Sequence, residues 1–246
     1  MSKRGTRTIA GVDVGPETRI VTYVSRGFES MRGFDIFMRS AKLIYERYPN
    51  VIFFVVGTDR IAYGGDENYI PGHKSFKEWT LSRDKYDMGK FVFTGRLTPA
   101  ELGRLLATSD LHIYLTVPFV LSWSMMDALS CGATVLASRT PPIEEMIRDG
   151  ENGLLADFFK PEEFAEKAVE VLKDPAAFRQ LGKAGEQMIV EKYSLEAVLP
   201  RMLKMYEDVM ARRPAVERRE VDAGEAGEEM VTQSVKLKAP KSPFLG

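Results

Sequence analysis

The sequence contains one cysteine and two histidines among its 246 residues. Cys131 has no second cysteine with which to form an internal disulfide, and the polar, basic first residues do not resemble a secretory signal. Both observations favour a cytoplasmic location, because structural disulfides belong to oxidising compartments. His73 and His112 are too few to complete a closed His/Cys zinc site, so we expect no bound metal.

Long apolar runs and an excess of one charge are also missing. The chain has 34 Lys and Arg residues against 35 Asp and Glu residues, so no overall field attracts nucleic acid or an anionic membrane. No segment approaches the roughly 18 consecutive apolar residues that a membrane-spanning helix needs. Apolar residues still make up 44% of the chain, which is close to the globular average and sufficient for a core.

Short β-rich runs alternate with amphipathic helical patterns along the first two thirds of the chain. The expected strands cover residues 20–24, 51–56, 91–93, 111–115, 134–137 and 154–156, and the expected helices cover residues 34–45, 99–107, 124–130 and 143–147. The expected strands are apolar throughout, which is typical of strands covered on both faces. Alternation of strand and helix predicts a parallel sheet with right-handed crossovers. We therefore expect an α/β fold with a single Rossmann-like, doubly wound sheet.

The length allows one large domain or two small ones. Three further helices are expected at residues 161–172, 175–192 and 195–212, so that one domain covers residues 18–212. Residues 1–17 are expected to be a poorly defined leader, and residues 213–246 a disordered charged tail. Residues 62–87 form a long polar segment with a helical pattern only at residues 76–81. Long loops inside compact domains are often functional.

Two arginines follow the first expected strand, at a place where parallel sheets bind ligands. Arg26 and Arg32 lie in a loop flanked by glycines, directly before a helix. The start of a helix offers free backbone N–H groups, and guanidinium groups offer forked donors for phosphate. This arrangement suits a diphosphate, although both arginines are also compatible with a solvated surface. The glycine-rich motifs GxGxxG and GxxxxGK[ST] are absent, which argues against classical dinucleotide and P-loop sites.

The exit of the fourth expected strand, residues 116–127, is an apolar stretch that leads into a helix. Ser122 or Ser124 can cap that helix. Asp127 lies early in it, where an acid is often only a partner for the helix dipole. Trp123 is of a residue type that is more often part of a core than of a ligand platform. Gly57, at the end of the second strand, is weak evidence for close approach of a ligand.

These motifs together resemble the C-terminal, donor-binding half of a glycosyltransferase of family 4, the group 1 transferases of GT-B fold. The resemblance covers about residues 18–212, and its specificity lies in the order and spacing of the motifs. They are Arg26-Gly27, Arg32-Gly33, Gly57, residues 91–97, residues 127–138 and residues 147–155.

The resemblance implies roles for individual residues. Arg26 and Arg32 are expected to act on the donor diphosphate as catalytic residues, with Arg32 standing where the family usually has a lysine. Asp127 stands where the family has a glutamate that binds the ribose hydroxyls. The expected donor-binding residues, including a nucleobase loop at residues 95–97 and a phosphate-facing backbone at residues 121–124, are Gly27, Gly57, Gly95, Arg96, Leu97, Leu121, Ser122, Trp123, Ser124 and Asp127.

Phe119 is a departure from the family pattern. It stands eight residues before Asp127, where the family has a glutamate that contacts hydroxyls of the donor sugar. The resemblance implies a retaining, metal-independent transferase whose donor is a nucleoside diphosphate sugar, with UDP and GDP both open, and which needs no further cofactor. The alternative, favoured by Phe119, is a non-catalytic subunit that binds nucleotide-sugar or acts as a scaffold for another glycosyltransferase chain.

The length of the chain accommodates only one half of a GT-B enzyme. The family places the acceptor mainly on an N-terminal domain, and packs the last helix against that domain. We therefore expect an N-terminal acceptor domain, a partner chain or self-association through the helix at residues 195–212. That helix carries an apolar stripe that includes Leu199, Leu203 and Tyr206.

Overall fold

A computed structural model describes residues 6–119 and 121–211 of the chain. The expected tail at residues 213–246 and the first five residues lie outside this part. The chain divides into two compact units, Met1–Val198 and Leu199–Gly246.

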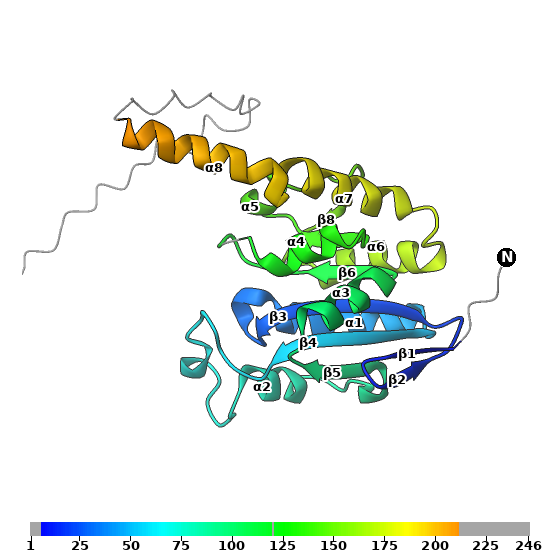
Figure 1. Cartoon of the computed structure of the whole chain (residues 1–246). Helices are drawn as coiled ribbons and strands as arrows, with labels where there is room; N and C mark the ends of the chain where they lie inside the picture. Colours follow the sequence, from blue (N-terminus) through cyan, green and yellow to red (C-terminus); the bar gives the residue numbers. More distant parts are fainter. Residues whose placement is uncertain (1–5, 120, 212–246) are drawn as a thin grey trace, which may run out of the picture. The chain divides into compact units, whose positions relative to one another are not determined.

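The first unit is built on a six-stranded, entirely parallel sheet with the strand order β5-β4-β3-β6-β7-β8 (Figure 1). This confirms the expected doubly wound fold. The chain builds the sheet outwards from β3 in one direction and then from β6 in the other, so the two neighbours at the centre mark the point where the order reverses. The strands are β3 (Arg19–Gly27), β4 (Val51–Thr58), β5 (Phe91–Gly95), β6 (Leu111–Tyr114), β7 (Val135–Ser138) and β8 (Leu154–Ala156).

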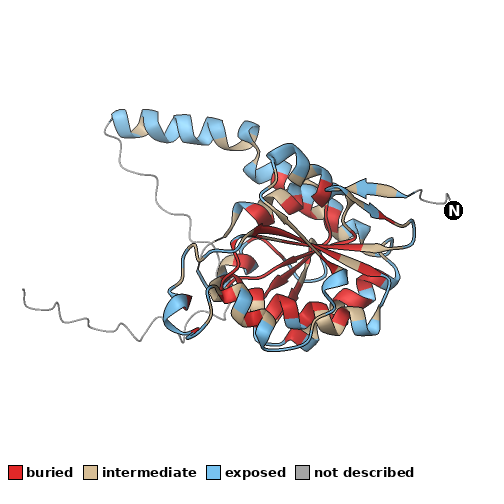
Figure 2. Cartoon of the chain, turned by 90° about the horizontal axis from the view of Figure 1, so that it is seen from below, coloured by how far each residue is buried: buried red, intermediate tan, exposed pale blue. Residues whose placement is uncertain are grey.

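Helices cover both faces of this sheet, and the buried residues gather in the strands and on the helix faces turned toward them (Figure 2). One face is packed by α1, α2 and α6, which share a core with the inward side chains of β3 and β4. The other is packed by α3, α4, α5 and α7. The helices are α1 (Phe34–Arg47), α2 (Phe76–Ser82), α3 (Pro99–Thr108), α4 (Trp123–Ser130), α5 (Pro141–Glu144), α6 (Pro161–Lys173), α7 (Arg179–Tyr193) and α8 (Leu195–Met210), with short 3₁₀ helices η1 (Ser30–Arg32), η2 (Asp66–Asn68) and η3 (Met88–Lys90).

Three local expectations differ from the structure. The segment expected to be a poorly defined leader contains an antiparallel hairpin of β1 (Arg7–Ile9) and β2 (Val12–Val14). Its turn places Ala10 and Gly11 in the left-handed region. Helix α7 begins at Arg179 and not at residue 175, because Ala177 donates its amide to the carbonyl of Asp174 in a preceding turn. Helix α5 begins at Pro141, whose fixed φ suits a first helical position, and ends before the expected residues 145–147.

Helix α8 has the expected apolar stripe. In the second unit, Leu199, Leu203 and Tyr206 of this helix are exposed. Among the described residues, no helix is both long and apolar enough to cross a membrane.

His112 lies fully buried in β6. Its Nδ1 atom is 2.9 Å from the Thr22 hydroxyl, while Nε2 has no hydrogen-bond partner among residues 6–119 and 121–211. Burial, followed by the nearby charge of Arg32, lowers the pKa of His112 to about 3. The folded protein therefore keeps this ring neutral well below the ordinary histidine pKa of about 6.5.

This depressed pKa predicts a loss of stability in mild acid. Between the folded and unfolded pKa values the unfolded chain binds the extra proton, so the free energy of unfolding should fall as the pH drops below about 6.5. In His112→Gln, the difference in unfolding free energy between pH 7 and pH 4 should shrink by about 2–3 kcal/mol. Urea unfolding at both pH values measures it, with His73→Gln as the control. If the difference in unfolding free energy between pH 7 and pH 4 were the same in His112→Gln as in the wild type, the low pKa of His112 would be contradicted.

Candidate functional site

The candidate site lies where the connections that leave β3 and β6 meet. The carboxyl ends of neighbouring strands at a reversal of strand order leave a crevice in doubly wound sheets. The two connections touch directly, because the amide of Val117 donates to the carbonyl of Met31 over 3.1 Å. Arg26 and Arg32 belong to the first connection, and the start of α4 closes the second.

Gly33 makes this close approach possible. It has a φ of 60° between η1 and α1, and a Cβ atom at this position would lie 2.9 Å from the Cβ atom of Leu115. A larger residue would be strained by its backbone angle and would push the two connections apart. The glycine that follows Arg32 in the sequence therefore fixes where that arginine lies.

Arg32 is buried, with only 3% of its surface exposed. Its guanidinium carbon lies 5.1 Å from the centre of the Tyr114 ring, and its Nε atom has no hydrogen-bond partner in the described part of the chain. Within the described residues, no carboxylate forms a salt bridge with it. The alternative of a solvated surface arginine is therefore wrong for Arg32. A buried cation is costly unless it is paired, which makes this guanidinium a candidate binding group for an anion.

Arg26 differs from Arg32, because its side chain is exposed at the end of β3. Its Nη1 atom lies 3.5 Å from the hydroxyl of Tyr63. The Tyr63 ring in turn contacts the ring of Phe119, with 5.6 Å between the two centres. The structure thus links Arg26 to the position where the sequence departs from the family pattern. Sequence reasoning missed Tyr63, which lies in the long polar segment after β4.

Two buried carboxylates attach this long segment to the loop between the arginines. Oε2 of Glu29 accepts hydrogen bonds from the amides of Ala62, Tyr63 and Gly64 at 3.0, 2.9 and 3.0 Å. Asp66 accepts from the amide and the hydroxyl of Ser30 at 2.8 and 2.5 Å. Sequence reasoning also missed Glu29 and Asp66. The position of Glu29 between Arg26 and Arg32 was a signal that could have found it. Their hydrogen bonds hold Tyr63 beside Arg26.

The start of α4 offers fewer free amides than the phosphate-facing backbone that we expected at residues 121–124. Ser122 caps the helix by accepting from the amide of Ser124 at 3.3 Å, and its own amide donates to the Tyr114 hydroxyl at 2.9 Å. Among the described residues, the amides of Leu121 and Trp123 have no protein acceptor. These two N–H groups are the ones that α4 offers to an anion at its positive end.

Neither Trp123 nor Asp127 has the structural role that is most common for its residue type and position. Trp123 is 82% exposed at the first position of α4, so it is not a core residue. Because the helix begins there, Asp127 falls in its second turn and does not act as a first-turn cap. Partial burial raises the pKa of the Asp127 carboxyl above its usual value. Among the described residues, no ion pair joins Asp127 to Arg26 or Arg32.

The glycines at the strand ends have different explanations. A Cβ atom at Gly57 would lie 2.1 Å from the carbonyl oxygen of Ser25, and one at Gly27 would lie 2.3 Å from that of Arg60. Backbone packing therefore accounts for both glycines without a ligand. Gly95 has a φ of 71° with open space around it, and Arg96 beside it is exposed.

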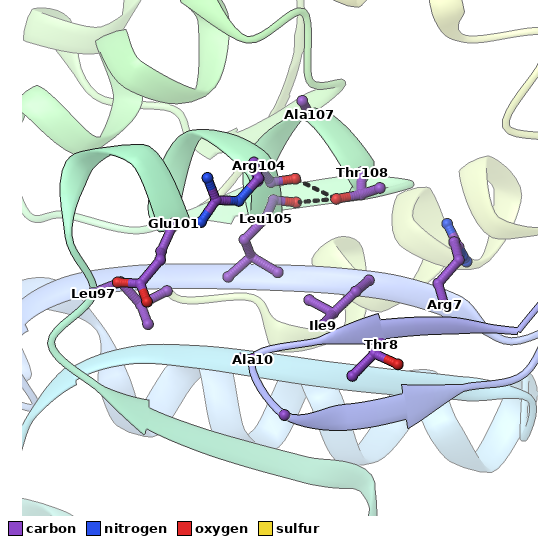
Figure 3. Close-up of a pocket in the computed structure, with 11 residues that line it drawn as sticks. Arg7, Thr8, Ile9, Ala10, Leu97, Glu101, Arg104, Leu105, Ala107 and Thr108 are labelled. Atoms are coloured by element: carbon purple, nitrogen blue, oxygen red, sulfur yellow. Dashed lines mark hydrogen bonds between the residues drawn. The ribbon is translucent and has the colours of Figure 1, made fainter.

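A pocket of about 610 Å³ lies elsewhere, between the β1–β2 hairpin and α3 (Figure 3). Ile9 and Leu105 give it an apolar floor, and Glu101 and Arg104 lie along it. It shares only Leu97 with the expected donor-binding residues. Arg26, Arg32 and the first residues of α4 do not line this pocket. It therefore does not replace the candidate site at the ends of β3 and β6. Among the described residues, no group of three or more His, Cys, Asp or Glu side chains is arranged to hold a metal ion.

Comparison with known proteins finds both similar sequences and similar structures. The chain is 22% identical to spore coat protein SA of Bacillus subtilis over 191 residues. The aligned region covers 77% of this chain and 48% of that protein. Its structure is similar to that of Anabaena HepE in complex with UDP and glucose, with a TM-score of 0.65 and 18% identity over 78% of this chain and 49% of that one. The C-terminal domain of a Francisella tularensis glycosyl transferase group 1 protein (LpcC) matches with a TM-score of 0.58 and 17% identity, over 72% of this chain and 87% of that domain.

The chain spans about half, or less, of the length of the curated relatives it matches, between 29% and 48% for the first two. The sheet matches one Rossmann-like half of a GT-B fold. The sequence model of the family described as "Glycosyl transferases group 1" matches residues 9–188, which include the connections after β3 and β6 and both arginines of the candidate site. This chain therefore belongs to the glycosyl transferases of group 1.

Proposed function

We propose that this chain is the donor-binding half of a retaining, metal-independent glycosyltransferase whose donor is a nucleoside diphosphate sugar. The observation that carries the proposal is the buried guanidinium of Arg32, which forms no salt bridge with a carboxylate of the described residues. Family membership supports glycosyl transfer in general. The complex of Anabaena HepE with UDP and glucose supports a nucleotide-sugar as the ligand.

The proposed role of the site is to stabilise the leaving diphosphate. As the bond between the sugar carbon and the terminal phosphate oxygen breaks, negative charge grows on that phosphate. Arg26, Arg32 and the two amides at the start of α4 are donors that belong to the connections after β3 and β6. Removing one such donor typically raises the barrier by about 3 kcal/mol or more. The acceptor oxygen forms its bond to the sugar on the same face, and its proton passes to the leaving phosphate.

The remaining donor contacts are proposed for other expected residues. An acceptor-only carboxylate such as that of Asp127 suits the two hydroxyls of a ribose. Aspartate is shorter than glutamate by one methylene, so a bridging water is consistent with this contact. The exposed ring of Trp123 and the loop at residues 95–97 are proposed to border the nucleobase. UDP and GDP are both retained as the nucleotide, and no further cofactor is proposed.

A complete reaction also requires an acceptor-binding half. We propose that an N-terminal domain, a partner chain or a second copy that docks through α8 supplies it. The apolar stripe of α8 and the coverage of only about half of spore coat protein SA support this proposal.

The alternative function is a non-catalytic subunit that binds nucleotide-sugar or acts as a scaffold for another glycosyltransferase chain. Phe119 favours it, because an aromatic ring occupies the place of the usual glutamate and has no group to bind sugar hydroxyls. Binding of a donor without turnover in the presence of an acceptor half would support this alternative.

Transfer with an added acceptor half distinguishes the two functions. The purified chain is mixed with UDP-glucose or GDP-glucose, the separately produced acceptor-binding half of a group 1 enzyme and its acceptor, in the presence of EDTA. We expect a product only when both halves are present, with the anomeric configuration of the donor, read by NMR. An inverted product would contradict retention, and transfer abolished by EDTA would contradict metal independence. Rapid transfer by the chain alone would contradict its proposed incompleteness.

A further inference from the structure

Tyr114, the last residue of β6, contacts both parts of the proposed anion site. The guanidinium of Arg32 lies over its ring, with 5.1 Å between the guanidinium carbon and the ring centre. Its hydroxyl oxygen accepts a hydrogen bond of 2.9 Å from the amide of Ser122, the N-cap residue of α4. Tyr114 itself is only 1% exposed. One buried side chain therefore joins the loop after β3 to the start of α4.

The ring of Tyr114 holds the Arg32 cation without neutralising it. A desolvated guanidinium is attracted to the negative face of an aromatic ring. Because the ring has no net charge, the guanidinium keeps its positive charge for an anion. The backbone of Arg32 is fixed separately, since its carbonyl accepts a hydrogen bond of 2.7 Å from the hydroxyl of Tyr23. Both ends of this arginine are thus positioned by buried tyrosines, one from β3 and one from β6.

The hydroxyl of Tyr114 fixes the place where α4 begins. Ser122 donates its amide to this hydroxyl, and its own side chain accepts the amide of Ser124 over 3.3 Å. The N-cap residue is therefore held by the sheet on one side and by its helix on the other. Leu121 and Trp123, whose amides have no acceptor in the described part of the chain, flank this residue in the sequence.

We propose that Tyr114 is a positioning residue that sets the spacing between the Arg32 guanidinium and the free amides of α4, an inference that rests on the proposed donor-binding function. The two phosphates of a diphosphate share one bridging oxygen, so donors that bind both at once need a fixed separation. Donors that are already in place lose little conformational freedom on binding, and they stabilise developing charge without reorganisation. In this proposal Tyr114 acts through these donors and does not touch the ligand.

Calorimetric titration of the full chain with UDP and uridine, and with GDP and guanosine, tests this role. Tyr114→Phe keeps the ring but removes the hydroxyl, and should lower the affinity for the diphosphate that binds about three- to fivefold. Tyr114→Leu also removes the ring and should lower that affinity about ten- to thirtyfold. The affinity for the matching nucleoside should change by less than about twofold in both variants, because the two donors serve the phosphates.

A matched control and a double variant separate positioning from general damage. Tyr45→Phe also removes a hydroxyl that accepts a backbone amide, that of Asp87 at 3.2 Å, which precedes the amino end of β5. It should leave diphosphate affinity unaltered. In an Arg32→Met background the ring has no cation to hold, so Tyr114→Leu should add only the loss of about three- to fivefold that belongs to the hydroxyl.

The possible results distinguish this role from the proposed function. Equal losses for diphosphate and nucleoside in the Tyr114 variants would show a purely structural residue and would overturn the positioning role while donor binding stands. An unaltered diphosphate affinity in Tyr114→Phe, or the same loss from Tyr114→Leu with and without the Arg32 guanidinium, would also overturn it. If the wild-type chain binds neither UDP nor GDP, the proposed function fails, and the positioning role fails with it.

Discussion

Replacing Arg32 with methionine is expected to stabilise the fold and to remove most of the affinity for a nucleoside diphosphate. Methionine fills a similar volume against the Tyr114 ring but carries no charge. Because the native guanidinium is buried and forms no salt bridge with a carboxylate of the described residues, its removal should raise the free energy of unfolding by about 1 kcal/mol or more. Loss of a charged donor should weaken diphosphate binding about 10- to 100-fold. Urea unfolding and calorimetric titration measure the two effects.

Arg39→Met is the matched control for this prediction. Arg39 lies on α1, is exposed and pairs with Asp35 one helical turn away. Its replacement should change the unfolding free energy by no more than about 0.5 kcal/mol and leave nucleotide affinity unaltered. If Arg32→Met proved several kcal/mol less stable than the wild type, the buried arginine would be a structural residue whose burial is compensated within the protein.

Replacing Glu29 with alanine is expected to have the largest effect on stability among the site variants. It leaves the amides of Ala62, Tyr63 and Gly64 without their acceptor. Removing one partner from a buried, charged hydrogen-bond network costs about 3–5 kcal/mol. The free energy of unfolding should fall by that amount, and hydrogen exchange at these three amides should become faster, because the segment after β4 is no longer attached.

Exchange measured residue by residue separates this prediction from general destabilisation. The amides of the central strand β3 should remain the slowest to exchange in Glu29→Ala, with the local change confined to residues 62–64. Glu46→Ala, on the exposed side of α1, should change the unfolding free energy by less than about 0.5 kcal/mol. Unaltered protection at residues 62–64 would refute the role assigned to Glu29.

The fold was predictable because its signals are local. The apolar run that forms β4 and the spacing of three and four residues in α1 are legible in the sequence, and alternation of such elements implies a parallel sheet. The β1–β2 hairpin was missed because its strands have only three residues each, too few for a recognisable alternation. The first residues of α5 and α7 depend on turns, where periodicity carries little information.

The site was predictable only in part, because its decisive contacts join residues that are far apart in the sequence. The positions of Arg26 and Arg32 followed from the glycine-flanked loop before a helix. Arg26 is exposed, whereas Arg32 is buried against Tyr114, which belongs to a different strand. The contact between Glu29 and the amides of residues 62–64 spans more than thirty positions, and no periodic pattern encodes it. The position of Tyr63 beside Arg26 depends on that contact.

Calorimetric titration of the wild-type chain with UDP, GDP, uridine and guanosine is the most direct test of a diphosphate site at the β3–β6 crevice. We expect at least one nucleoside diphosphate to bind, and Arg26→Ala to lower its affinity about tenfold while the matching nucleoside is affected far less. The absence of binding by both diphosphates at millimolar concentration, or an equal loss for diphosphate and nucleoside in Arg26→Ala, would contradict a donor site at this crevice.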